Sequence, residues 1–334
     1  MLRRILRKIL WIGIVFIGIT LVGFFVIHLA PGSPTDLQTT MNPLADAQAQ
    51  ERLAAFYGLD KPLYEQYALW LKRLVQLDFG NSMGSDSRPV TEKIAERLPL
   101  TLWINAATML LTLLLSVPIG VCAARKRGGV FDKITTLIVF LGFALPGFWL
   151  SLLLMVQFSI ELQWLPLSGL VSLDYASLSL PEKALDIARH LLLPIFVSTF
   201  GSLAGMSRFM RASMLDVLRS DFILTARAKG LPERLVLFRH ALANALLPLI
   251  TILGLSVPGL IGGSVILEYI FSLPGMGQLF YNAVMARDYP LIMGNLVLGA
   301  VLTLAGNLLA DFAYGLADPR IRSGLLLDGK REEG

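Results

Sequence analysis

The sequence predicts an all-α integral membrane protein with six membrane-spanning helices. Hydrophobic residues make up 55% of the chain and charged residues only 16%, and the mean hydropathy is +0.66. Both values are typical of proteins whose solvent is the bilayer. The charges are gathered between apolar windows of about 20 residues, the length that a helix needs to cross the hydrocarbon core. The predicted spans cover residues 9–29, 100–123, 134–160, 191–211, 245–267 and 290–316.

The first window is expected to stay in the membrane as an anchor, residues 1–30. Its apolar run from Ile9 to Leu29 is longer than the hydrophobic core of a signal peptide. The residues around its end, His28-Leu29-Ala30-Pro31, make a poor cleavage site. The third window is interrupted by Pro146-Gly147, and we expect a long helix that tilts or kinks there.

The loops complete the predicted domain plan. Residues 31–98 form the only segment long enough for an extramembrane subdomain, and they contain a stretch, Leu63 to Leu74, with apolar residues at helical spacing. That helix is expected to pack on the membrane face or on the bundle, because about 70 residues are few for an independent binding lobe. The remaining parts are a five-helix core, 99–317, with a polar loop, 212–244, and a polar tail, 318–334.

The distribution of Lys and Arg predicts the orientation. Most of these residues lie before the first span, between the second and third, between the fourth and fifth, and after the sixth. Under the positive-inside rule both termini are therefore cytoplasmic, and the 31–98 segment is outside. The sequence pI of about 9.4 reflects this asymmetry and the anionic lipid of the inner leaflet, not nucleic acid.

The polar interval from Arg219 to Pro248 predicts a short helix followed by a second helix that re-enters the membrane. Ser220 or Asp221 is suited to begin the short helix as its cap. Gly230 stands where a left-handed residue ends a helix, and Pro232 suits the first turn of the next one. Such a helix, with small residues on a basic loop, is a candidate docking surface; a plain connection between two helices is the alternative.

The residues of this interval resemble the coupling loop of ABC-importer permeases, and more closely that of the dipeptide, oligopeptide and nickel branch. Leu224-Thr225-Ala226 stands where the general pattern has Glu-Ala-Ala, a departure typical of the peptide branch. The resemblance runs nearly end to end and is closest to the first of the two paired permeases. It is carried by Thr225-Ala226-Arg227-Ala228-Lys229-Gly230-Leu231, Arg239-His240-Ala241-Leu242, His28-Leu29-Ala30-Pro31-Gly32-Ser33-Pro34, Asp78-Phe79-Gly80-Asn81-Ser82, Ser272-Leu273-Pro274-Gly275-Met276-Gly277 and Arg287-Asp288-Tyr289-Pro290.

The resemblance implies a type I ABC-importer permease fold, in a multi-pass protein of the bacterial cytoplasmic (inner) membrane. It implies a second homologous permease, two ABC ATPase subunits and an extracytoplasmic substrate-binding protein as partners. The chain has no Gly-x-x-x-x-Gly-Lys-Ser/Thr phosphate loop, so ATP hydrolysis is expected on the partners and no cofactor is expected here. The residues expected to couple to the ATPases are Asp221, Thr225, Ala226, Arg227, Ala228, Lys229 and Gly230.

The implied substrates are di- or oligopeptides, with nickel complexes, glutathione and antimicrobial peptides as alternatives for the same architecture. The run Val257 to Gly263 predicts a helix that bends or opens beside a pathway, with tight helix packing as the alternative. The small or polar side chains proposed to line that path are Ser256, Ser264, Asn295 and Asn307.

Other function classes find less support in the sequence. A secondary carrier or channel is disfavoured because Asp311 is nearly alone as an ionisable residue within a span, where pairing at the membrane interface is the simpler role. An intramembrane protease would need a histidine deep in a span. No Cys and His cluster predicts a metal site, and the single cysteine, Cys122, is expected to be a small buried thiol.

Overall fold

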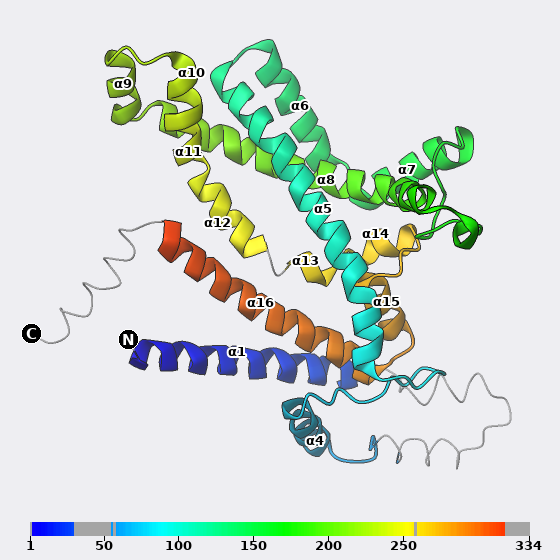
Figure 1. The fold of residues 1–334 in the computed structure, drawn as a ribbon. Helices are drawn as coiled ribbons and strands as arrows, with labels where there is room; N and C mark the ends of the chain where they lie inside the picture. The colour runs from blue at the N-terminus through cyan, green and yellow to red at the C-terminus, as the bar shows by residue number, and fades with distance from the viewer. Residues whose placement is uncertain (1, 30–54, 56–57, 257–258, 318–334) are drawn as a thin grey trace, which may run out of the picture. The chain divides into compact units, whose positions relative to one another are not determined.

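A computed structural model describes residues 2–29, 55, 58–256 and 259–317, and within them every element of regular secondary structure is a helix (Figure 1). The chain forms two compact units. The first unit comprises Met1–Thr101, Ile261–Val265 and Pro274–Leu304. The second comprises Leu102–Leu260, Ile266–Leu273 and Ala305–Gly334.

The first unit contains α1 (Leu2–Leu29), α4 (Leu63–Val75), the start of α5 (Val90–Arg125), α15 (Met276–Met285) and most of α16 (Tyr289–Ala317). Helix α4 is the amphipathic helix predicted at residues 63–74, and it packs on α1. The Tyr67 hydroxyl lies 3.0 Å from Thr20 Oγ1, and the Phe24 and Tyr67 rings meet edge to face at 5.3 Å. The expectation that this helix packs on the bundle is confirmed.

A small core joins the start of α5 to α15 and α16. Val90 is fully buried in it, together with residues of α16 such as Leu291 and Ile292. The approach is close at Gly294, where a Cβ atom would lie 2.6 Å from Val90 Cγ1. Glycine is needed there because any side chain would push the two helices apart.

The second unit contains the rest of α5 and the longest helix, α8 (Leu180–Leu218), with α6 (Val130–Ala144) and α7 (Gly147–Met155) packed against α8. Asp132 near the start of α6 forms a two-bond ion pair with Arg211 of α8, at 2.6 and 2.8 Å. After α8 the chain continues through short helices: α9 (Asp221–Ala228), α10 (Glu233–Leu235), a π-helix (Val236–Ala241), α11 (Leu242–Ala245) and α12 (Leu247–Ser256).

Five helices in the described residues are long and apolar enough to cross a membrane, and six spans result if one bent pair counts as one. That pair is the third predicted span. It is not one kinked helix: α6 and the segment Gly147–Glu161 meet at 97°. Leu145 is extended (φ −88°, ψ 119°), as steric clash with Pro146 requires, so the helix ends before the proline.

Two spans extend beyond their predicted windows. Helix α5 begins at Val90 and α8 at Leu180, each about ten residues before the apolar window. A capping box explains the start of α8, since Ser179 and Glu182 bond to each other's backbone. Hydropathy marks only the apolar part of a helix, so the polar first turns were missed.

The fifth span is interrupted where the sequence predicted a bend. Helix α12 covers Leu247–Ser256 and α13 covers Gly259–Gly262. Gly263, whose φ is +62°, and Ser264 then separate α13 from α14 (Val265–Ile270). Cβ atoms built on Gly259 and Gly262 would meet nothing within 4 Å. These two glycines therefore do not serve tight helix packing among the described residues.

One expectation about a single side chain is wrong. Cys122 is exposed, although it was predicted to be buried, because it lies on the face of α5 opposite Val121 and Ala124, which enter the core. The Asp311 side chain and the tail 318–334 lie outside the described residues.

Candidate functional site

The candidate coupling segment, residues 219–248, begins with helix α9. Its bounds, Asp221–Ala228, agree with the sequence prediction. Ser220 occupies the cap position with extended backbone, but its hydroxyl donates to the Val217 carbonyl at 2.6 Å and makes no cap to α9. Asp221 in the first turn places a negative charge at the positive end of the helix dipole. Farther along, Thr225 donates to the Asp221 carbonyl at 2.8 Å.

The end of α9 is a Schellman turn built on Gly230. Its φ is +75°, in the left-handed region that favours glycine. The Gly230 N–H donates to the Arg227 carbonyl at 2.9 Å, and the Leu231 N–H donates to the Ala226 carbonyl at 3.3 Å. These are the two bonds that close this motif. Pro232 follows as the cap residue directly before α10, one position earlier than the first-turn place that the sequence predicted.

An ion pair fastens the two short helices to each other. Arg227 Nη2 and Nε donate to the two carboxylate oxygens of Glu233, at 2.7 and 3.1 Å. The Glu233 carboxylate raises the pKa of Arg227, so this arginine is always charged. Both side chains are about half exposed, so the pair contributes about 0–1 kcal/mol of stability and acts mainly on geometry.

Helix α9 has one face buried in the chain's own core and one face free. Ile223 and Ala226 are buried with Val236 and Leu237 of the following π-helix. The expectation that Ala226 is displayed for docking is thus wrong, because its methyl group fills an internal contact. The other predicted coupling residues are exposed: Asp221, Thr225, Arg227, Ala228, Lys229 and Gly230.

The free face also carries two large apolar side chains that the sequence prediction did not include. Phe222 is 47% exposed and Leu224 is 53% exposed. The signal was present in the sequence, since Phe222, Ile223 and Leu224 place apolar groups all round one helical turn, more than one buried face can use. Large exposed apolar groups on a basic loop are what a protein contact needs.

The segment is anchored to the rest of the second unit. The π-helix Val236–Ala241 carries Arg239 and His240, and π-helical turns are frequent at functional sites. The Ser213 hydroxyl of α8 donates to the Ala245 carbonyl of α11 at 2.9 Å. The segment that follows α9 is therefore packed against α8 as well as against α9.

The four candidate path residues are not gathered into one described site. Ser264 and Asn295 belong to the first unit, and Ser256 and Asn307 to the second. The Ser256 hydroxyl donates to the Ile252 carbonyl of its own helix at 2.7 Å. Ser264 and Asn295 are half-buried, and Asn307 is exposed.

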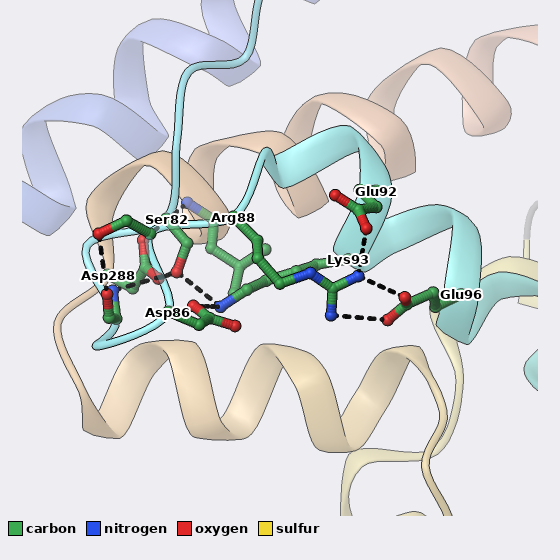
Figure 2. A network of polar contacts seen from close by, with 10 residues as sticks. Ser82, Asp86, Arg88, Glu92, Lys93, Glu96 and Asp288 are labelled. Carbon is green, nitrogen blue, oxygen red and sulfur yellow. Dashed lines mark hydrogen bonds and ion pairs between the residues drawn. The ribbon is translucent and has the colours of Figure 1, made fainter.

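The first unit carries a separate polar network at the start of α5 (Figure 2). The Ser82 hydroxyl donates to buried Asp288, which also accepts the Leu291 N–H at 3.2 Å and so caps α16. Lys93 donates to Ser82 at 2.8 Å and pairs with Asp86 at 2.7 Å. The hydrogen bond from Lys93 lowers the pKa of Asp86. Beside it, Arg88 pairs with two glutamates of α5, Glu92 and Glu96.

This network holds the segment before α5 against the start of α16. Its central pair, Ser82 and Asp288, comes from two motifs of the sequence analysis, 78–82 and 287–290, which lie far apart in the chain. The joint role of Ser82 and Asp288 is structural, because the Ser82 hydroxyl and both Asp288 carboxylate oxygens are hydrogen-bonded within the chain.

Comparison with known proteins identifies the family. Residues 116–323 match the model described as binding-protein-dependent transport system inner membrane component, and residues 1–105 match its N-terminal counterpart. The chain is 43% identical to the oligopeptide transport system permease protein AppB of Bacillus subtilis, over 95% of this chain and 98% of that one. It is 39% identical to the di/tripeptide permease DppB of Pseudomonas aeruginosa (96% and 99% covered) and 36% identical to the dipeptide permease DppB of Escherichia coli K12 (96% and 99% covered).

A solved structure shares the fold. It is titled as inward-facing conformations of the MetNI methionine ABC transporter, and the match covers 68% of this chain and 97% of that chain, with a TM-score of 0.53 at 16% identity. At that identity the likeness shows the fold alone, that of a type I ABC-importer permease. With the family matches covering both halves of the chain, this protein belongs to the binding-protein-dependent transport system inner membrane components, the multi-pass permease subunits of ABC importers.

Proposed function

We propose that this chain carries di- or oligopeptides across the inner membrane as one pore-forming subunit of an ABC importer. The observation that carries the proposal is the near full-length similarity to permeases named for peptide transport, at 36–43% identity. Nickel-complex, glutathione or antimicrobial-peptide uptake by the same architecture is the alternative. Family membership implies an ATPase, a binding protein and a paired permease; the proposed assembly has a second homologous permease, two ATPase subunits and one extracytoplasmic binding protein.

In the proposed assembly α9 docks on an ATPase subunit. Its exposed face, with Phe222, Leu224, Thr225 and Ala228, would lie in a groove of the partner, a helix-in-groove contact. Arg227, Lys229 and Gly230 set the turn beside that face. Closure of the ATPases on ATP would press α9, and the buried contact of Ile223 and Ala226 with the π-helix would transmit the push.

The path across the membrane is proposed to pass the interrupted fifth span. The break at Gly263 and Ser264 before α14, with open space beside Gly259 and Gly262, supports a helix that rearranges there. Ser256, Ser264, Asn295 and Asn307 remain the proposed lining residues. The charge bias supports cytoplasmic termini, a cytoplasmic 212–244 loop and an external 31–98 segment.

The substrate proposal is tested by uptake in the host with the gene for this chain deleted. Labelled di-, tri- and pentapeptides, glutathione and nickel are supplied in turn, and the wild-type gene is returned as the control. We expect peptide uptake to be lost on deletion and restored by the gene, with nickel and glutathione uptake unchanged. Normal uptake of every peptide in the deletion strain would refute peptide transport.

The docking proposal is tested with two matched substitutions. Leu224→Asp places a charge on the exposed face of α9, and Leu173→Asp places one at a fully exposed residue of the loop before α8. We expect Leu224→Asp to lose both peptide uptake and co-purification of the ATPases, because the charge would be desolvated in the groove. Leu173→Asp should retain ATPase co-purification. Retention of the ATPases by Leu224→Asp, at equal membrane content, would count against docking through α9.

A further inference from the structure

A cavity in the second unit is not used by the proposed transport mechanism. It has a volume of about 330 Å³ and lies among α5, α6 and α8. Its polar end is formed by Arg208, Arg211 and two threonines, and its apolar wall includes Phe140 and Phe143. A slot of about 40 Å³ shares Ile119, Thr135, Val139 and Ser207 with it and adds Ile138, Phe200 and Leu203. Because they share four lining residues, the two spaces adjoin, and together they are called the groove here: two arginines line its larger part, and mainly apolar residues line the slot.

The basic end carries one uncompensated charge. Asp132 takes both hydrogen bonds of Arg211 at 2.6 and 2.8 Å, so that pair is neutral as a unit. Arg208 is exposed, and among the described residues it has no acidic partner. An arginine presents five N–H donors in a planar fork that suits phosphate oxygens.

The walls of the groove favour a hydrocarbon chain over a peptide. The hydroxyls of Thr135 and Thr136 donate to carbonyls of their own helix, at 2.9 and 2.7 Å, and Ser207 is buried. They leave few polar groups for a peptide backbone. Phe140 and Phe143 of α6, which also line the cavity, are 67% and 63% exposed.

From this juxtaposition we propose that the groove binds one anionic phospholipid. The phosphate lies on Arg208, and an acyl chain follows Phe140, Val139 and Phe200 into the slot. Basic pockets between membrane helices on the cytoplasmic side are suited to anionic headgroups. Given the proposed orientation, the lipid comes from the inner leaflet, and it holds α6 to α8 beside the Asp132–Arg211 pair.

The test is native mass spectrometry of the delipidated permease, in complex with its partners, with added phosphatidylglycerol or phosphatidylcholine of the same acyl chains. We expect one phosphatidylglycerol bound, with a preference of about fivefold or more over phosphatidylcholine, the effect of one arginine at an anionic surface. Arg208→Gln should abolish the preference. Arg219→Gln removes the same charge three turns along, at the end of α8, and should leave it intact. Equal binding of both lipids by the wild type, or an unchanged preference in Arg208→Gln, would overturn the proposal.

A second variant tests the apolar part of the groove. Val139 lines both spaces and is half-buried, so Val139→Trp should fill the groove and reduce binding of long-chain phosphatidylglycerol. Inorganic phosphate and a dipeptide serve as competitors. Full displacement of the lipid by phosphate would indicate a simple anion site, and displacement by the dipeptide would assign the groove to the transport path; either result refutes a lipid site. Lipid binding is measured without transport, so the lipid proposal can fail or succeed independently of the peptide-uptake test.

Discussion

The Asp132–Arg211 ion pair holds α6 against α8 through two side chains, one 7% and the other 30% exposed. Asp132 also accepts the Gly128 N–H at 2.8 Å, which fixes the turn before α6. Removal of one partner from a buried pair leaves the other charge without compensation. The pair therefore stabilises the packing of α6 on α8, and its loss should destabilise both helices.

Asp132→Asn is predicted to lower the free energy of unfolding by about 2–3 kcal/mol, less than for a fully buried pair because Arg211 keeps some solvent contact. Thermal unfolding in detergent, followed by tryptophan fluorescence, measures the loss. Asp174→Asn is the control, since that carboxylate is exposed and lies in a loop. The double variant Asp132→Asn with Arg211→Met should recover part of the loss. Equal stability of Asp132→Asn and wild type would show that the pair is not structural.

Two glycines of the second unit give opposite predictions for the same substitution. A Cβ on Gly120 of α5 would lie 2.6 Å from Met210 Cβ and 3.0 Å from the Arg211 backbone nitrogen, whereas one on Gly201 of α8 would meet nothing within 4 Å. Gly120→Ala is predicted to destabilise the chain by about 1–3 kcal/mol, through overpacking. Gly201→Ala is predicted to stabilise it by about 0.5–1 kcal/mol, through lower backbone entropy in the unfolded state. The same unfolding assay decides, and equal effects would contradict the close α5–α8 contact.

At the scale of elements, the sequence predicted helix ends best where the backbone conformation favours a glycine or a proline. Gly230 ends α9 as predicted, and Pro232 lies one residue before its predicted place in the first turn of α10. The free face of α9 was not predicted correctly, because whether Ala226 points inward depends on the π-helix that packs on it. Burial of a small apolar residue in a short helix is a tertiary property that sequence periodicity over eight residues does not fix.

The 97° break of the third span illustrates the same limit. Pro146 predicts that a helix ends or kinks, but the angle between the two segments is set by what they pack against, here α8. The path residues are a related case. They were chosen as small or polar groups in apolar helices, and the proposed pore would be shared with another chain.

Gly230 gives the prediction that belongs to this scale. Gly230→Ala keeps the turn at a cost of about 1 kcal/mol or more, because alanine must adopt a φ of +75°. Gly230→Pro cannot adopt that φ and also removes the N–H that bonds to the Arg227 carbonyl. We expect Gly230→Ala to lower peptide uptake in part and Gly230→Pro to abolish it, with both chains inserted in the membrane. Wild-type uptake by Gly230→Pro would contradict a role for this turn in coupling.

At the scale of the whole molecule, the two units differ in the helices and cores that they contain. The first unit joins the N-terminal helix, α4 and α16 around a small core and the Ser82–Asp288 network. The second unit holds the short helix α9 and the larger core on which it rests. The proposed orientation, which rests on the charge bias of the sequence, puts α9 on the cytoplasmic side and the 31–98 segment, which carries Ser82, outside.

That sidedness is open to a direct test, because Cys122 is the single cysteine and one substitution, Cys122→Ser, removes it. In that background Ser85→Cys and Ala228→Cys each place one thiol at an exposed residue, the first before α5 and the second on α9. We expect a membrane-impermeant maleimide to label the 85 variant in right-side-out vesicles and the 228 variant only in inside-out vesicles. Labelling after detergent is the control for thiol reactivity. If both variants reacted from the same side, the proposed topology would be wrong, and docking of α9 on a cytoplasmic ATPase would fail with it.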